Sequence, residues 1–158
     1  MKTEIMTPNE ITKMEESKRQ HLEFIQNIIT RMNANSFQIK GLGITLVTAL
    51  MAVYASTKNV TFIFLGILPL LLFWFLDSYY LQQERKFRGI YNDVTGLKDK
   101  ISIRPYEMPI HKYTKELDKQ FSYWNVFFSP TIKWLYLSVI LILILVGLLL
   151  TYKDCLFN

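Results

Sequence analysis

The hydrophobic residues of this chain collect in three long blocks. The blocks run over residues 41–57, 60–76 and 134–152. A helix needs about 20 mostly apolar residues to cross the hydrocarbon core of a bilayer. The third block carries no charged residue and has aromatic residues at both ends, which membrane interfaces favour. The pattern therefore predicts three transmembrane helices.

The first two blocks are about 17 residues long, at the short end of the range for a membrane span. A buried hairpin in a soluble protein is the alternative interpretation. Such a hairpin needs amphipathic helices to cover it, and the chain offers too few. The composition, 51% hydrophobic and 20% charged, also differs from that of a soluble domain. We therefore expect an all-α integral membrane protein.

The positive charges predict the orientation of the spans. Lysines and arginines precede the first block and crowd the segment between the second and third, whereas only Lys58 and Lys153 fall on the other side. Cytoplasmic loops carry the excess of positive charge. The first forty residues are polar and show no signal peptide. We expect the N-terminus in the cytoplasm, the C-terminus outside, and a multi-pass protein of the bacterial inner membrane.

Long amphipathic helices are predicted on the cytoplasmic side. Thr7-Pro8-Asn9-Glu10 has the residue types of a helix start. Apolar residues then recur at spacings of three and four, and this stripe packs either on the chain's own middle region or on another subunit, the second being preferred. The stripe comprises Leu22, Ile25, Ile29 and Met32, widened by Phe24 and Ile28.

The remaining pattern divides the chain into four parts. These are an amphipathic helix over 1–40, a transmembrane hairpin over 41–77, a cytoplasmic helical region over 78–131, and the third span with an external tail over 132–158. Gly41 and Gly43 leave open whether the first helix bends before its span. Within 78–131 we expect a helix running on through Tyr91, a strand or extended stretch near 101–104, and an amphipathic helix over 111–124.

Three features of the spans are candidates for packing or for a pore. Small and hydroxyl residues share one face of the first span, and this face either packs against the second span or forms a pore or subunit interface. Pro69 is expected to kink the second span. Asp77 ends that span, where an acid needs a partner or water. The face comprises Gly41, Thr45, Thr48, Ala49, Ala52 and Ser56.

Enzyme chemistry is not indicated. The sequence shows no phosphate-binding glycine loop, nucleophile elbow or dinucleotide fingerprint. His21 and His111 stand far apart and Cys155 is the single cysteine, so neither a metal site nor an internal disulfide is expected. We predict no enzyme activity and no cofactor.

A basic surface interleaved with aromatic residues remains on the predicted cytoplasmic side. Such a surface can hold phosphate groups and stack bases. The alternative is that these cations only enforce topology and attract anionic lipids of the bilayer. The candidate ligand-binding residues are Arg85, Lys86, Arg88, Tyr91, Arg104 and Lys112.

Two segments of the chain resemble a known class of proteins. Residues 31–40, Arg-Met-Asn-Ala-Asn-Ser-Phe-Gln-Ile-Lys, and residues 73–91, beginning Phe-Trp-Phe-Leu-Asp-Ser-Tyr-Tyr, are similar to small bacterial antiphage membrane effectors. The classes it resembles are the SLATT-like two-span effectors and the membrane channel effector of the Hailong system. The likeness covers roughly residues 21–93, and the third span departs from a two-span effector.

This resemblance implies a function for the whole chain. The expectation is a homo-oligomer, a tetramer or similar, that forms an ion channel or disrupts the membrane in antiviral defence. Its gating ligand would be a nucleotide or oligonucleotide made by an operon-encoded nucleotidyltransferase. The alternative is a non-conducting membrane anchor or scaffold that recruits a cytoplasmic partner.

Overall fold

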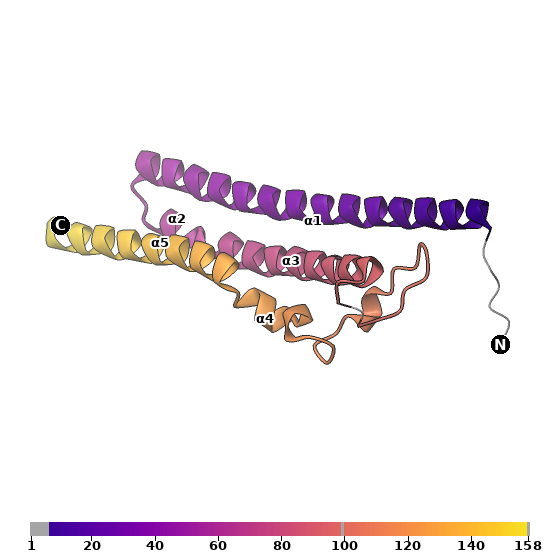
Figure 1. The fold of residues 1–158 in the computed structure, drawn as a ribbon. Coiled ribbons are helices and arrows are strands. Elements are labelled where there is room, and N and C mark those ends of the chain that lie inside the picture. The colour runs from indigo at the N-terminus through magenta and orange to yellow at the C-terminus, as the bar shows by residue number, and fades with distance from the viewer. Residues whose placement is uncertain (1–6, 99, 158) are drawn as a thin grey trace.

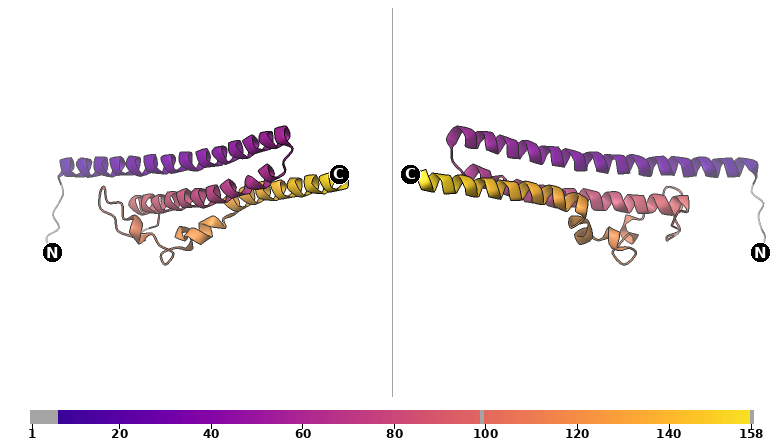
Figure 2. Two further views of the ribbon diagram at one scale, coloured as in Figure 1. Left: turned by 180° about the vertical axis from the view of Figure 1, so that it is seen from behind. Right: turned by 60° about the vertical axis from the view of Figure 1, so that its left-hand side comes forward.

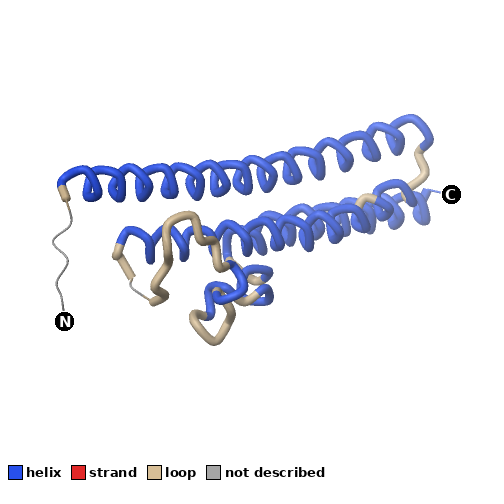
Figure 3. The backbone as a smooth tube through the Cα atoms, turned by 90° about the vertical axis from the view of Figure 1, so that its right-hand side faces the viewer, coloured by secondary structure: helices blue, strands red, loops and turns tan. Residues whose placement is uncertain are grey.

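The computed structural model describes residues 7–98 and 100–157, and over this part of the chain the regular structure is entirely helical (Figures 1 and 3). Three helical stretches are long and apolar enough to cross a membrane: Pro8–Thr57, Thr61–Thr95 and Pro130–Lys153. The predicted all-helical fold with three such helices is confirmed. The elements are α1 (Pro8–Thr57), α2 (Thr61–Leu65), α3 (Ile67–Thr95), α4 (Tyr123–Phe127) and α5 (Pro130–Phe157), with the 3₁₀ turns η1 (Ile110–Lys112) and η2 (Lys119–Phe121).

Helix α1 begins where the sequence predicts. The Glu10 carboxylate accepts a hydrogen bond from the Thr7 N–H and another from the Thr7 hydroxyl, both 2.8 Å long, and Pro8 is the first helical residue. The helix then continues through Gly41 and Gly43 without a break, so the bend that these glycines left open does not form. At 1.5 Å per residue, α1 is about 75 Å long, far more than a membrane span requires.

Helices α1 and α3 run antiparallel along most of α3 (Figures 1 and 2). Ile25 packs with Phe87 and Ile90 at one end of this pair, and Gly43 approaches Phe73 at the other. The α1 stripe thus packs on the chain's own middle region. Within the single chain, this is the alternative to the self-association that the sequence analysis preferred. We call residues 8–39 and 78–129, which extend beyond the apolar spans, the polar part of the molecule.

The second span is interrupted, as a proline inside it suggests. Helix α2 ends at Leu65, Gly66 forms a turn, and α3 starts at Ile67. Pro69 therefore lies in the first turn of α3. The N–H groups of a first turn have no partner within the helix, so the missing N–H of proline costs no hydrogen bond there. The predicted kink takes the form of a break three residues before the proline.

Helix α5 packs on the side of α3 that α1 leaves free (Figures 1 and 2). Just before α5 begins, Phe127 of α4 stacks on the Trp74 ring of α3 at 4.6 Å between centroids. The Trp74 indole N–H also donates to the Phe127 carbonyl at 3.1 Å. Near the far end, Gly147 lets α5 approach α2 so closely that a Cβ there would lie 2.6 Å from the Phe64 ring. The middle span is consequently the most covered of the three.

The prediction of an amphipathic helix over residues 111–124 is wrong. This segment forms η1, η2 and the start of α4, joined by turns. Asp118 accepts a hydrogen bond from the Gln120 N–H, which ends one turn and begins another, and Tyr113 and Phe121 are both buried against α3. Contacts to α3 therefore override the local helical pattern. Residues 101–104 form no strand: Ile101 lies in a bend, and residues 102–104 have no regular secondary structure.

Candidate functional site

A buried ionic junction lies where the apolar spans meet the polar part. Asp77 on α3 is completely buried, and the Lys40 ammonium on α1 lies 2.7 Å from its carboxylate oxygens. The Ser36 hydroxyl on α1 also donates to this carboxylate. Lys40 retains 24% side-chain exposure, so the pair is wetted from the lysine side only. The predicted need of Asp77 for a partner is met by one helix, α1.

Helix α5 brings a fourth group to this junction. The Tyr136 side chain is 1% exposed, stacks near Trp74 at 6.0 Å, and lies beside the Asp77 carboxylate. Its hydroxyl faces that carboxylate, and neither the hydroxyl nor the Asp77 Oδ2 atom makes a well-aligned hydrogen bond within the described part of the chain. The junction thus joins all three membrane helices around one buried acid.

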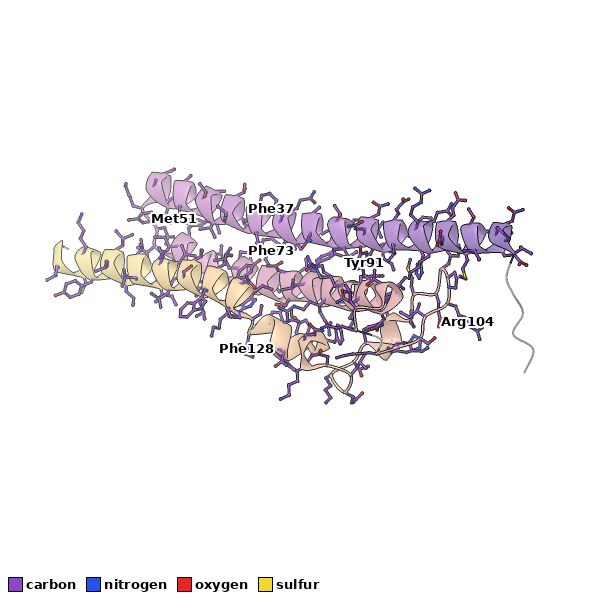
Figure 4. All side chains as sticks on the ribbon, in the orientation of Figure 1. Phe37, Met51, Phe73, Tyr91, Arg104 and Phe128 are labelled. Carbon is purple, nitrogen blue, oxygen red and sulfur yellow. The ribbon has the colours of Figure 1, made fainter. Side chains whose placement is uncertain are left out.

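The six candidate ligand-binding residues do not form a single site. Arg104 and Lys112 line an open hollow of about 680 Å³ with Tyr106 and Glu107, a volume within the usual range for small-molecule sites. Arg88 and Tyr91 line a second hollow between α1 and α3. Figure 4 shows Tyr91 beside α1 and Arg104 farther out on the loop. The remaining two candidates, Arg85 and Lys86, line neither hollow.

Two of these cations already have acidic partners. Arg88 pairs with the buried carboxylate of Glu84 one turn earlier on α3. Lys112 lies 3.6 Å from Glu107. The backbone N–H of Arg104 donates to the Glu107 carboxylate and holds the pKa of Glu107 below its ordinary value, and Lys112 lowers this pKa further. Glu107 therefore stays ionised and lowers the net positive charge of the larger hollow.

The loop over this hollow is fastened to α1 by residues that the sequence analysis missed. Tyr106 takes a left-handed backbone conformation (φ 64°), which is uncommon for an aromatic residue. Its hydroxyl donates to the Gln20 side chain at 2.7 Å, and its ring lies 6.0 Å from that of His21. Nothing in the sequence pairs residue 20 with residue 106, because the contact depends on the antiparallel packing of α1 on α3.

Burial of His21 gives a pH prediction. The imidazole is 1% exposed between α1 and the loop, near Lys18 and the Glu107 carbonyl. Burial lowers its pKa below the ordinary value of 6.5, an effect that the Glu107 carbonyl partly offsets. Below pH 6.5 the His21 imidazole takes up a proton more readily in the unfolded chain than in the folded one. The free energy of unfolding is therefore retained above pH 6.5 and falls as the pH drops below it. Thermal unfolding at pH 7.5 and 5.5 should show this loss, and His21→Gln should reduce it.

The small-residue face of α1 does not pack against the second span, which corrects one of its two interpretations. Thr45, Thr48, Ala52 and Ser56 are exposed, as are Gly41 and Ala49. The opposite face of α1 packs on α2 and α3 through Gly43, Val47, Leu50, Met51 and Tyr54. Larger side chains thus form the contact within the chain, and the small face points away from it. Its role as a pore or subunit interface stays a prediction.

Comparisons with known proteins assign no family. No family model matches the chain, and neither the curated proteins nor the solved structures give a match. The fold and the junction define an all-helical protein with three helices able to span a membrane and a helical part that extends beyond them.

Proposed function

We propose that this protein is a homo-oligomeric membrane channel effector of a bacterial antiphage defence system, gated by a nucleotide or oligonucleotide on its cytoplasmic side. Three helices in one chain cannot enclose an ion path, so conduction requires several copies. The family resemblance supplies the biological setting. The structure contributes one supporting observation, the uncovered small-residue face of α1.

This face is suited to close contact between copies. Membrane helices associate through small and hydroxyl residues, because these let backbones approach and offer interhelical hydrogen bonds. Thr45 and Thr48 direct their hydroxyls to carbonyls one turn earlier in α1, at 2.9 Å in both cases, so neither needs a partner in lipid. Copies that meet along this face would bring their first spans into close contact around a central path.

Enlarging the face should weaken assembly. Ala52→Leu adds bulk where we expect two copies to meet, and it should shift the purified protein toward monomer by tenfold or more in association constant, as a clash at a tight interface does. Val53→Leu changes an exposed residue on another face and should leave assembly intact. Native mass spectrometry in detergent measures both. If the two variants had the same oligomeric mass and the same fraction of monomer, lipid and not a second copy would cover the small face.

The hollow beside Arg104 and Lys112 is the proposed ligand site. Its cations and the Tyr106 ring provide phosphate contacts and a stacking surface. Changing both cations to glutamine should weaken binding of a short oligonucleotide about tenfold or more and reduce the salt dependence of binding. Lys58→Gln with Lys153→Gln, which removes two cations from exposed positions outside this hollow, is the matched control. Fluorescence anisotropy over a salt series measures the effect, and unchanged affinity would remove the assignment.

One observation favours the second candidate function, a non-conducting anchor that recruits a cytoplasmic partner. The pairs Arg88–Glu84 and Lys112–Glu107 neutralise cations that a phosphate ligand would need. A scaffold uses such a mixed-charge surface for protein contacts. It predicts partner binding without ion flux, whereas the channel predicts flux.

A further inference from the structure

Helix α4 exposes large aromatic side chains that the described part of the chain leaves uncovered. Its inner side packs on α3, where Val126 and Phe127 are buried. Its outer side, together with the residue that ends the helix, carries Trp124 and Phe128, which are 60% and 57% exposed and lie 6.4 Å apart between ring centroids. A helix that is apolar on opposite sides is usually buried in a core or in lipid. The outer side of α4 therefore needs a cover from outside the chain.

Contacts with α3 place α4 at the level where the second apolar span ends. The Tyr123 hydroxyl donates to the Phe75 carbonyl at 3.0 Å, and the Phe127 ring lies 5.0 Å from the Phe75 ring. Phe75 precedes Asp77, the acid at the end of that span, by two residues. Helix α4 thus lies at the boundary between the apolar spans and the polar part (Figure 1).

The exposed aromatic surface of α4 continues onto the membrane helix that follows it. Helix α5 begins two residues after Phe128, and Trp134 in its second turn is exposed, with the Lys133 ammonium 5.3 Å from its ring centroid. Exposed leucines follow at positions 137 and 141 of the same helix. Figure 4 shows Phe128 on the side of the molecule opposite α1. Tryptophan favours the membrane–water boundary because its ring is apolar and its N–H is polar.

We propose that α4 is a membrane-surface anchor, additional to the three spans, that binds anionic phospholipids. Trp124 and Phe128 insert at the boundary between headgroups and acyl chains, and Lys119 and Lys133 on either side of α4 contact the lipid phosphates. Lys119 is exposed and Lys133 is partly exposed, and neither pairs with a carboxylate of a described residue. Both cations are therefore available to a negatively charged headgroup.

Lipid fits this surface better than a second copy or a protein partner does. The surface is continuous with that of α5, a helix long and apolar enough to cross the membrane. Insertion also leaves the polar groups of α4 bonded, because the Asn125 amide donates to the Lys119 carbonyl at 2.8 Å and the Val126 N–H donates to the Ser122 carbonyl at 3.1 Å. The anchor fastens the polar part to the bilayer whether or not the protein conducts ions.

The depth of the aromatic pair tests the anchor. In a Cys155→Ser background, a small fluorophore is attached at Trp124→Cys or, in a separate protein, at Phe128→Cys, and each protein is reconstituted in liposomes. Labels at Leu141 and Lys115, both exposed, represent mid-span and water. Lipids brominated near the headgroup should quench the two α4 labels most, lipids brominated deep in the chain should quench the mid-span label most, and aqueous acrylamide should quench the Lys115 label most.

Two results would overturn the anchor. One is quenching of both α4 labels by acrylamide as strongly as the label at Lys115, which would place α4 in water. The other is protection of both α4 labels from every quencher, which would show that a second copy covers them.

Exchange of the headgroup tests the choice of anionic lipid. At equal bromine content, brominated phosphatidylglycerol should quench the label at position 124 more than brominated phosphatidylcholine does. Lys119→Gln with Lys133→Gln should lower this preference roughly fivefold for each lysine removed. Lys58→Gln with Lys153→Gln, two exposed cations at the other end of the spans, is the control and should keep the preference.

Equal quenching by the two headgroups in the unsubstituted chain would overturn the assignment of anionic lipid to Lys119 and Lys133. Neither experiment reads ion flux. A silent channel would therefore refute the proposed function and leave the anchor standing.

Discussion

Replacing Gly89 with alanine is expected to destabilise the polar part of the molecule by about 2–3 kcal/mol, the upper range for overpacking a well-filled core. A Cβ at this position of α3 would lie 2.6 Å from the ring of Tyr113 and 2.9 Å from that of Phe121. Those rings meet edge to face at 5.3 Å, and both are buried, so neither can swing aside freely.

The rest of the loop makes this clash hard to relieve. The Tyr113 hydroxyl donates to Asp93 at 2.5 Å, and the other Asp93 oxygen accepts the Lys100 N–H at 3.0 Å. Chemical unfolding followed by circular dichroism measures the loss. Gly41→Ala is the control, because an added Cβ there meets nothing within 4 Å and alanine favours the helix. Equal stability of the two variants would contradict the packing described around Gly89.

Removing the Lys40 charge is the second large effect expected. Lys40→Met leaves the buried Asp77 carboxylate with Ser36 as its observed donor. Deleting one partner of a buried ion pair costs about 3–5 kcal/mol, and the partial exposure of Lys40 places this case near the lower end. The unfolding midpoint in detergent should fall clearly.

The double variant separates the ion pair from packing. Lys40→Met with Asp77→Leu removes both charges, and such replacements are often neutral or stabilising. It should recover most of the stability lost in Lys40→Met alone. A double variant as unstable as the single one would show that Lys40 acts through the packing of its side chain and not through its charge.

Local patterns predicted the membrane helices and the start of α1 because their causes are local. Long apolar blocks and the Thr7-Pro8-Asn9-Glu10 start act within a few residues of the chain. The partner of Asp77 could also have been found from sequence. Lys40 directly precedes the first apolar block and Asp77 directly follows the second, which places a base and an acid at the same level of an antiparallel hairpin.

Features set by distant contacts could not be predicted in the same way. Residues 111–124 carry a helical pattern, yet Tyr113 bonds to Asp93, twenty residues away, and the segment folds onto α3 in turns. Periodicity placed Thr48 and Ala52 on one face of α1 but did not say which face meets α3. The basic candidates likewise separate into two hollows because Arg88 lies on a helix and Arg104 on the loop beyond it.

Ion flux from liposomes that contain the purified protein tests the proposed channel most directly. The measurement is made with and without short nucleotides and oligonucleotides, at a protein density at which the oligomeric mass has been established. We expect flux that depends on both ligand and assembly, and that Ala52→Leu reduces while Val53→Leu does not. Liposomes that stay tight with every ligand, around a protein confirmed to be inserted, would contradict the channel and favour a membrane anchor.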